Sequence, residues 1–238
     1  MGESVLSRLG RKLLNIKYCG AVIVAAGSAS RMGGIDKVMA LLSGEPMIVR
    51  SVRAFQNCEV IKEIVVVTRE DLVIPVTKLC KDFSKVKAVV VGGDTRPESV
   101  NLGLNALSEK VNLAAIHDGA RPLISQEVIT RTVRAASKYA AAAPAAPVKD
   151  TVKIIEGGFV KKTPDRSQLF AVQTPQIFDF DLLRGALQKA AAEGREITDD
   201  CSAVENLGMS VRIVEGDERN LKVTTPLDLK IAQMLLEE

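Results

Sequence analysis

The sequence predicts an α/β fold in which helices flank both faces of a mainly parallel, twisted sheet that carries a protruding β-hairpin arm. Short apolar runs alternate with longer segments whose apolar residues recur at helical spacing, and this alternation is typical of such sheets. The chain has 238 residues, 47% of them apolar and 26% charged. These values are typical of a globular protein that buries a sizeable core, and they exclude disordered and fibrous classes.

Five apolar runs bounded by turn residues are predicted to be buried strands. They are residues 20–26, 63–68, 87–91, 113–117 and 211–215. Four segments between them have helix-compatible spacing: 46–56, 98–107, 126–136 and 180–193. The Ala-rich residues 140–146 are interpreted as a tightly packed strand or an edge. In sheets of this kind ligands bind beyond the carboxyl ends of the strands, so the loops there are where a site is expected.

Residues 148–172 interrupt the alternation. Two runs, TVKIIE and FVKKT, are joined by Gly157 and Gly158, and this pattern predicts a β-hairpin with a tight turn. An isolated hairpin is barely stable in water, so the arm is expected to dock on its own domain or on a second subunit. We therefore expect a single domain over residues 19–238, with the arm inserted at about 148–172 and a basic extension over residues 1–18.

Composition limits the partners and the compartment. The formal net charge is only +3, too small to indicate a nucleic-acid-binding protein. The four cysteines are isolated from one another, as expected of buried, reduced thiols in the cytoplasm. No apolar run is long enough to span a membrane. A cytoplasmic location is the simplest interpretation, with a plastid as the alternative, because the basic extension is either a short helix or frayed arm or, less simply, a transit peptide.

A loop rich in Gly and Ser follows the first predicted strand. The string AVIVAAGSASRMGG covers residues 21–34, and Lys37 follows it. Small residues let backbone N–H groups surround an anion, and Arg31 and Lys37 can neutralise phosphates. The alternative is an ordinary turn with solvated basic residues. Neither a P-loop nor an intact dinucleotide-binding fingerprint is present.

Together with six later motifs, this loop resembles the 2-C-methyl-D-erythritol 4-phosphate cytidylyltransferase family. The motifs are GGDTRPESVNLGL (92–104), HDGARP (117–122), APVKDTVK (146–153), KTPDRSQLFAVQTPQ (162–176), ITDDCSAVE (197–205) and VEGDERNLKVTTPLDL (214–229). The resemblance is collinear from about residue 20 to the C-terminus. It implies a Rossmann-like nucleotidyltransferase of the non-mevalonate isoprenoid pathway, which joins CTP to methylerythritol phosphate and releases pyrophosphate.

The resemblance also implies roles for residues from the whole length of the chain. The catalytic residues would be Arg31, Lys37 and Lys222. The nucleotide-binding residues would be Ala25, Ala26, Gly27, Gly93, Asp94, Ser99 and Asp118. The residues that bind the sugar-alcohol phosphate would be Thr151, Arg166, Thr174, Thr198 and Lys222. Asp118 would also hold Mg²⁺ or another hard divalent cation, which takes oxygen ligands.

The resemblance further implies a homodimer in which the arm reaches the neighbouring subunit's site. The charge and the apolar runs described above indicate neither nucleic acid nor membrane as a partner. Two positions depart from the family pattern. The family usually has Gly where this chain has Ala29, and Pro or Asn where it has Asp36. These departures affect the conformation of the first loop, because Ala adopts positive φ only at a cost.

Several of these residues have simpler structural interpretations. Asp94 is alternatively a local cap in a strand-to-helix turn, Thr198 an N-cap, and Arg166 an interface ion pair. His117, the single histidine, is expected to make a structural hydrogen bond on the face of the strand opposite Asp118. No general base is required, because a phosphate monoester has a second pKa of about 6 and attacks as a dianion.

Two other functions compete with the one that the resemblance implies. A pentitol phosphate cytidylyltransferase, such as one for ribitol 5-phosphate, has the same chemistry, although the motifs at 162–176 and 197–205 favour methylerythritol phosphate. A non-catalytic nucleotide-binding scaffold is the alternative from a different class. The presence of both Arg31 and Lys37 disfavours it, because a binding module has less need of cations at the reacting phosphate.

Overall fold

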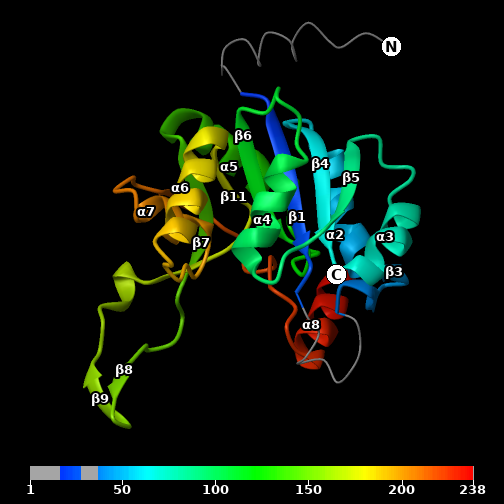
Figure 1. The fold of residues 1–238 in the computed structure, drawn as a ribbon. Coiled ribbons are helices and arrows are strands. Elements are labelled where there is room, and N and C mark those ends of the chain that lie inside the picture. The colour runs from blue at the N-terminus through cyan, green and yellow to red at the C-terminus, as the bar shows by residue number, and fades with distance from the viewer. Residues whose placement is uncertain (1–16, 28–36, 238) are drawn as a thin grey trace, which may run out of the picture.

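The computed structural model describes residues 17–27 and 37–237, with the backbone alone described at Lys37. Its centre is an eight-stranded sheet in the order β10-β7-β11-β6-β1-β4-β5, with β12 also paired to β7 (Figure 1). The strands are β1 (Cys19–Ala25), β4 (Ile61–Thr68), β5 (Val86–Val91), β6 (Leu113–Asp118), β7 (Ala141–Pro147), β10 (Phe170–Val172), β11 (Gln176–Asp179) and β12 (Arg212–Glu215). All five predicted strands are present, and the Ala-rich segment is the strand β7.

The sheet is mainly parallel, as predicted. β1 pairs in parallel with β4 and β6, β4 with β5, and β7 with β12. β11 is antiparallel to both β6 and β7, and β10 is antiparallel to β7. The sequence patterns did not predict these two short antiparallel strands. β11 links the parallel half of the sheet to β7, whereas β10 pairs with β7 alone.

Helices cover both faces of the sheet, which confirms the predicted layers. On one face lie α2 (Met47–Asn57), α3 (Val73–Leu79) and α5 (Gln126–Tyr139), and on the other lie α4 (Arg96–Asn105), α6 (Phe180–Ala192) and α7 (Asp200–Glu205). Side chains alternate between the faces along each strand. In β1, for example, Ile23 is buried in the core with α2 and α5, whereas Val22 is buried in the core with α4 and α6.

The close approach of α4 to the sheet depends on Gly103. A Cβ atom at this position would lie 2.3 Å from Cγ1 of Val22 on β1 and 2.8 Å from Cγ2 of Val67 on β4. No side chain can occupy such a space without displacing the helix. This contact sets the distance between α4 and the sheet, and therefore the position of the loop that precedes α4.

Smaller elements complete the described chain. The C-terminal helix α8 (Pro226–Glu237) packs beside the short hairpin of β2 (Leu41–Leu42) and β3 (Glu45–Pro46). Three 3₁₀ turns are η1 (Lys37–Met39), η2 (Glu70–Leu72) and η3 (Arg166–Gln168). The four cysteines are free and buried, as expected. None of the helices in the described part of the chain is both long and apolar enough to cross a membrane.

The predicted hairpin is present and projects away from the body of the molecule (Figure 1). It consists of β8 (Ile154–Glu156) and β9 (Phe159–Lys162), which form a separate antiparallel sheet. Gly157 and Gly158 have φ values of 58° and 83°, as a tight turn of this kind requires. The last residues of the predicted arm form β10 and pair with the main sheet, so the protruding part ends before Phe170.

Candidate active site

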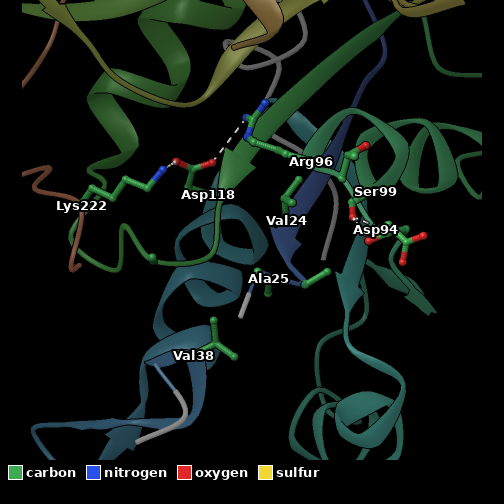
Figure 2. A pocket seen from close by; sticks show the side chains of 13 residues that line it. Val24, Ala25, Val38, Asp94, Arg96, Ser99, Asp118 and Lys222 are labelled. Carbon is green, nitrogen blue, oxygen red and sulfur yellow. Dashed lines mark hydrogen bonds and ion pairs between the residues drawn. The ribbon is translucent and has the colours of Figure 1, made fainter. Parts of the chain in front are cut away.

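A cavity of about 290 Å³ lies at the carboxyl ends of the central strands (Figure 2). It lies where the sheet order reverses, because the chain runs outward from β1 to β4 and β5 and then returns to β6 on the other side of β1. Such switch points are the usual ligand sites of open α/β sheets. The cavity is lined by Val24, Ala25, Ala26, Gly27, Val38, Gly93, Asp94, Thr95, Arg96, Ser99, Asp118, Ala120 and Lys222.

One wall is the turn between β5 and α4. The hydroxyl of the buried Ser99 accepts the backbone N–H of Gly93 at 3.1 Å, which fixes the turn against the first turn of the helix. A Cβ atom at Gly92 would lie 2.4 Å from Cβ of Ala26, so the turn packs closely on the loop after β1. Thr95, and not Asp94, caps α4, in a reciprocal pair of hydrogen bonds with Glu98. Asp94 is therefore an exposed carboxylate at the cavity and not the local cap of the alternative interpretation.

Asp118, the last residue of β6, lies between two cations. Its Oδ2 is 2.7 Å from Nζ of Lys222, and its Oδ1 is 3.4 Å from Nη2 of Arg96 (Figure 2). Burial would raise the pKa of Asp118, but the charges of Arg96 and Lys222 outweigh it and hold that pKa at about 2. The carboxylate is consequently ionised at neutral pH.

Arg96 is a charged residue of the cavity that the sequence did not predict as a site residue. It lies in the quoted motif GGDTRPESV, but nothing in the sequence indicates its partners. Its Nη2 is 2.8 Å from Oδ2 of Asp200 as well as near Asp118, so one guanidinium joins the start of α4, the end of β6 and the start of α7. Burial would lower the pKa of Arg96, but the two carboxylates raise it above its ordinary value, and Arg96 stays charged.

His117 confirms the structural role that was expected of it. It is fully buried, and its ring centroid lies 4.8 Å from that of Phe55 on α2. Asp118, the next residue, contacts Arg96 on the other face of the sheet. Its Nε2 is 3.2 Å from the carbonyl oxygen of Arg121, so Nε2 carries the hydrogen, and Nδ1 accepts the hydroxyl of Thr174 at 3.0 Å. Burial lowers the pKa of His117 to about 4, which keeps the ring neutral.

The structure brings together most of the predicted nucleotide-site residues. The predicted residues that line the cavity are Ala25, Ala26, Gly27, Gly93, Asp94, Ser99, Asp118 and Lys222. Arg31 lies outside the described residues, as do Ala29 and Asp36. Lys37 begins η1 immediately before the cavity residue Val38, and its side chain is not described.

Four predicted substrate residues do not line this cavity. Thr174 is only 4% exposed, and its hydroxyl is shared by His117 and the backbone N–H of Asp118. Thr151 and Arg166 are exposed in the arm, where Nη1 of Arg166 donates to the carbonyl of Lys149 at 2.8 Å. Thr198 is also exposed. It does not cap α7, because the N-cap is Asp199.

The donor set of the cavity suits a hard cation that also binds phosphate. Within the described residues there is no cluster of three or more His, Cys, Asp or Glu that could form a complete metal site. Two carboxylates, Asp94 and Asp118, line the cavity, and Asp118 is ionised. Mg²⁺ in proteins is commonly bound by one or two carboxylates together with substrate phosphates, so these residues fit a nucleotide-dependent magnesium ion.

Comparisons with known proteins agree on one family. Residues 19–238 match the family model described as 2-C-methyl-D-erythritol 4-phosphate cytidylyltransferase. The protein of that name from Caldanaerobacter subterraneus is 42% identical over 227 residues, which cover 92% of this chain and 98% of the relative. The one from Dehalococcoides mccartyi strain 195 is 43% identical over 222 residues, covering 92% of this chain and 96% of that relative.

Solved structures give the same result. The 4-diphosphocytidyl-2C-methyl-D-erythritol synthase of Anaerococcus prevotii superposes with a TM-score of 0.85 at 31% identity, covering 93% of this chain and 99% of that chain. The 2-C-methyl-D-erythritol 4-phosphate cytidylyltransferase of Thermus thermophilus superposes with a TM-score of 0.77 at 32% identity, covering 91% and 98%.

Proposed function

The chain belongs to the 2-C-methyl-D-erythritol 4-phosphate cytidylyltransferase family, and on that premise we propose that CTP and methylerythritol phosphate react in the cavity at the end of β1. The chain is thus a nucleotidyltransferase of the non-mevalonate isoprenoid pathway. One observation carries the placement of the reaction: an ionised Asp118 lies between Arg96 and Lys222 at the switch point of the sheet. The pentitol phosphate alternative is not favoured, because both relatives compared above are named for methylerythritol phosphate.

The reaction exchanges one phosphoanhydride bond for another. A phosphate oxygen of methylerythritol phosphate attacks the α-phosphorus of CTP and forms a new P–O–P bond. The bond from the α-phosphorus to the oxygen that bridges it to the β-phosphorus breaks, and pyrophosphate leaves with that electron pair. The attacking phosphate is already a dianion near neutral pH, so the neutral, buried His117 is not required as a base.

Positive charge at the reacting phosphate is the main catalytic contribution that we assign to this chain. Charge builds up on the non-bridging oxygens of the α-phosphate in the transition state, and cations that contact these oxygens stabilise it more than they stabilise bound substrate. We assign this role to Lys222, which lines the cavity, and to Arg31 and Lys37 of the first loop. Lys222 is 42% exposed, so an incoming phosphate can reach it.

The nucleotide is assigned to the walls of the same cavity. The backbone of Ala25, Ala26 and Gly27 offers small, closely packed contacts, and the turn of Gly93, Asp94 and Ser99 offers backbone groups and a hydroxyl for the cytosine edge. Asp118 would hold Mg²⁺, which when bound neutralises phosphate charge.

We further propose that the arm completes a neighbouring subunit's site in a homodimer. Its strands expose apolar side chains that have no cover within the described chain, among them Ile155 (55% exposed), Phe159 (80%) and Val160 (59%). A hairpin of this length gains stability by docking. Thr151 and Arg166 on the arm would then bind the second substrate's phosphate beside Thr198 and Lys222, with Thr174 positioned behind them.

The test is pyrophosphate release by the purified protein with CTP and Mg²⁺, with methylerythritol phosphate and ribitol 5-phosphate offered in separate reactions. We expect turnover with methylerythritol phosphate. A clear preference for ribitol 5-phosphate would transfer the assignment to the pentitol enzyme, and no turnover with either compound would leave only the binding scaffold.

A further inference from the structure

Four alternating charges run from the interior of the protein to the cavity. Asp200 contacts Arg96 at 2.8 Å, Arg96 contacts Asp118 at 3.4 Å, and Asp118 contacts Lys222 at 2.7 Å. The four residues come from α7, α4, β6 and the segment that precedes α8, so no local sequence pattern brings them together. The charges sum to zero, with a carboxylate at the inner end and an ammonium at the outer end.

The two ends of this chain of charges differ most in exposure. From the inner end outward, the side chain of Asp200 is 0% exposed, that of Arg96 29%, that of Asp118 11% and that of Lys222 42%. A buried ion pair in low dielectric is held strongly, whereas an exposed one exchanges readily with solvent and with other anions. The inner pair is therefore the fixed end, and Lys222 is the exchangeable end.

A carboxylate at position 200 is costly for the fold. Among the described residues its Oδ1 is buried with no hydrogen-bond partner, and burial raises its pKa even though Arg96 opposes that shift. Replacing a buried ion pair by apolar residues is often neutral or stabilising, so stability alone gives little reason for this residue. Within the described chain, the carboxylate of Asp200 has one polar partner, Arg96, which itself lines the cavity.

We propose that Asp200 is a positioning residue, which fixes Arg96 against Asp118 so that Lys222 is the cation free to move to a substrate phosphate. With Arg96 held, Asp118 keeps one cationic partner when Lys222 leaves. Without Asp200, Arg96 loses its anchor, and Asp118 retains Lys222 more tightly. The inference rests on the proposed function, because the phosphate that attracts Lys222 is that of the substrates.

The test compares Asp200→Asn with Asp199→Asn. Both changes remove one negative charge from the start of α7. Asp199 is the N-cap of this helix, a position where Asn also serves, and its carboxylate contacts Gln176 instead of Arg96. We expect Asp200→Asn to lower kcat about tenfold while changing the Kd for CTP with Mg²⁺, measured by calorimetry without the second substrate, less than about threefold. Asp199→Asn should leave both near wild type.

A double-mutant cycle with Arg96→Gln separates positioning from a general structural effect. If Asp200 acts through Arg96, Asp200→Asn should lower kcat little further in the Arg96→Gln background, whereas an equal loss in both backgrounds contradicts the proposal. Wild-type kcat in Asp200→Asn also overturns it. If Asp200→Asn fails to fold by circular dichroism, Arg96→Lys takes its place, because a point charge cannot hold both carboxylates. Arg96→Lys should show the same loss of kcat, and normal turnover in this variant refutes the proposal.

Absence of turnover in the wild-type protein is a different result, because it contradicts the proposed function and not the role of Asp200.

Discussion

The hydroxyl of Thr174 lies 3.0 Å from Nδ1 of His117 and accepts the backbone N–H of Asp118 at 3.1 Å. The imidazole thus orients a hydroxyl that holds the backbone of the cavity carboxylate. Nδ1 fills this role only while it is unprotonated, because an N–H there would need the hydroxyl oxygen as its acceptor in competition with Asp118. The neutral ring is therefore a structural requirement, and it has a consequence for stability.

We expect the free energy of unfolding to fall as the pH is lowered from about 7.5 to about 5. Burial lowers the pKa of His117 to about 4 in the folded protein from an ordinary value of 6.5. Between these values the unfolded chain binds a proton that the folded chain excludes, so this contribution destabilises the fold progressively on acidification. The loss to pH 5 is about 2 kcal/mol. Urea unfolding followed by far-UV circular dichroism measures it, since the chain has no tryptophan.

The control is His117→Gln, whose side-chain amide can form hydrogen bonds but does not titrate in this pH range. Its stability should change less with pH than that of the wild type between pH 7.5 and 5. Parallel curves for the two proteins would show that His117 is not the group responsible.

The part of the site that local sequence determines was predictable, and the part that depends on distant contacts was not. The first loop, the turn at Gly93 and the acid at Asp118 each follow an apolar strand, and that pattern placed them at one edge of the sheet. The pairing of Arg96 with Asp200 joins residues 104 positions apart, so no periodicity encodes it. For the same reason nothing in the sequence showed that the hydroxyl of Thr174 is shared by His117 and Asp118.

The fold shows the same division. Strands with several buried β-branched residues were found from their apolar runs, as in β4. The strands β10 and β11 have only three and four residues, too few for a periodic signal. The helix α3 has seven residues and contains Pro75, which disfavours a helical prediction although Pro is tolerated in the first turn.

Two helical glycines should respond in opposite ways to alanine. Gly103→Ala should destabilise the protein by about 1–3 kcal/mol, because its Cβ would overlap Val22 across the α4–sheet interface. Gly185→Ala on the exposed side of α6 meets nothing within 4 Å and should stabilise it by about 0.5–1 kcal/mol. Urea unfolding of both variants checks the pair. Equal effects would mean that α4 has room to shift away from the sheet.

Removing the exchangeable cation should impair chemistry more than folding. Lys222→Met keeps the length of the side chain and removes the charge, and we expect kcat to fall about 100-fold, the typical effect of losing one group that stabilises transition-state charge. The matched control is Lys189→Met on α6, a half-exposed lysine whose ammonium lies 3.9 Å from a carboxylate oxygen of Glu193 and does not line the cavity. Steady-state pyrophosphate release measures both. Near-normal kcat in Lys222→Met would exclude it from the catalytic role.

The exposed face of the arm should be required for dimer formation. Phe159 is 80% exposed, and we expect Phe159→Ser to shift the protein toward monomer in sedimentation equilibrium, because burial of an aromatic side chain at an interface contributes about 2 kcal/mol or more. Lys161→Ser is the control, since this lysine is exposed on the same strand and pairs with Glu156. A wild-type monomer, or an unchanged association constant in Phe159→Ser, would contradict the proposed use of the arm.

Mixed dimers test whether each site is built from two chains. A Lys222→Met subunit retains an intact arm, and an Arg166→Ala subunit retains an intact cavity, so each homodimer should be nearly inactive. In the heterodimer, if arms reach across, the cavity with Lys222 receives the arm with Arg166, and one of the two sites is complete. If each arm serves its own chain, both sites stay defective. We therefore expect purified heterodimers, carrying different affinity tags on the two subunits, to recover about half of the wild-type activity per dimer. Recovery no greater than the sum of the two homodimers would place the whole site within one chain.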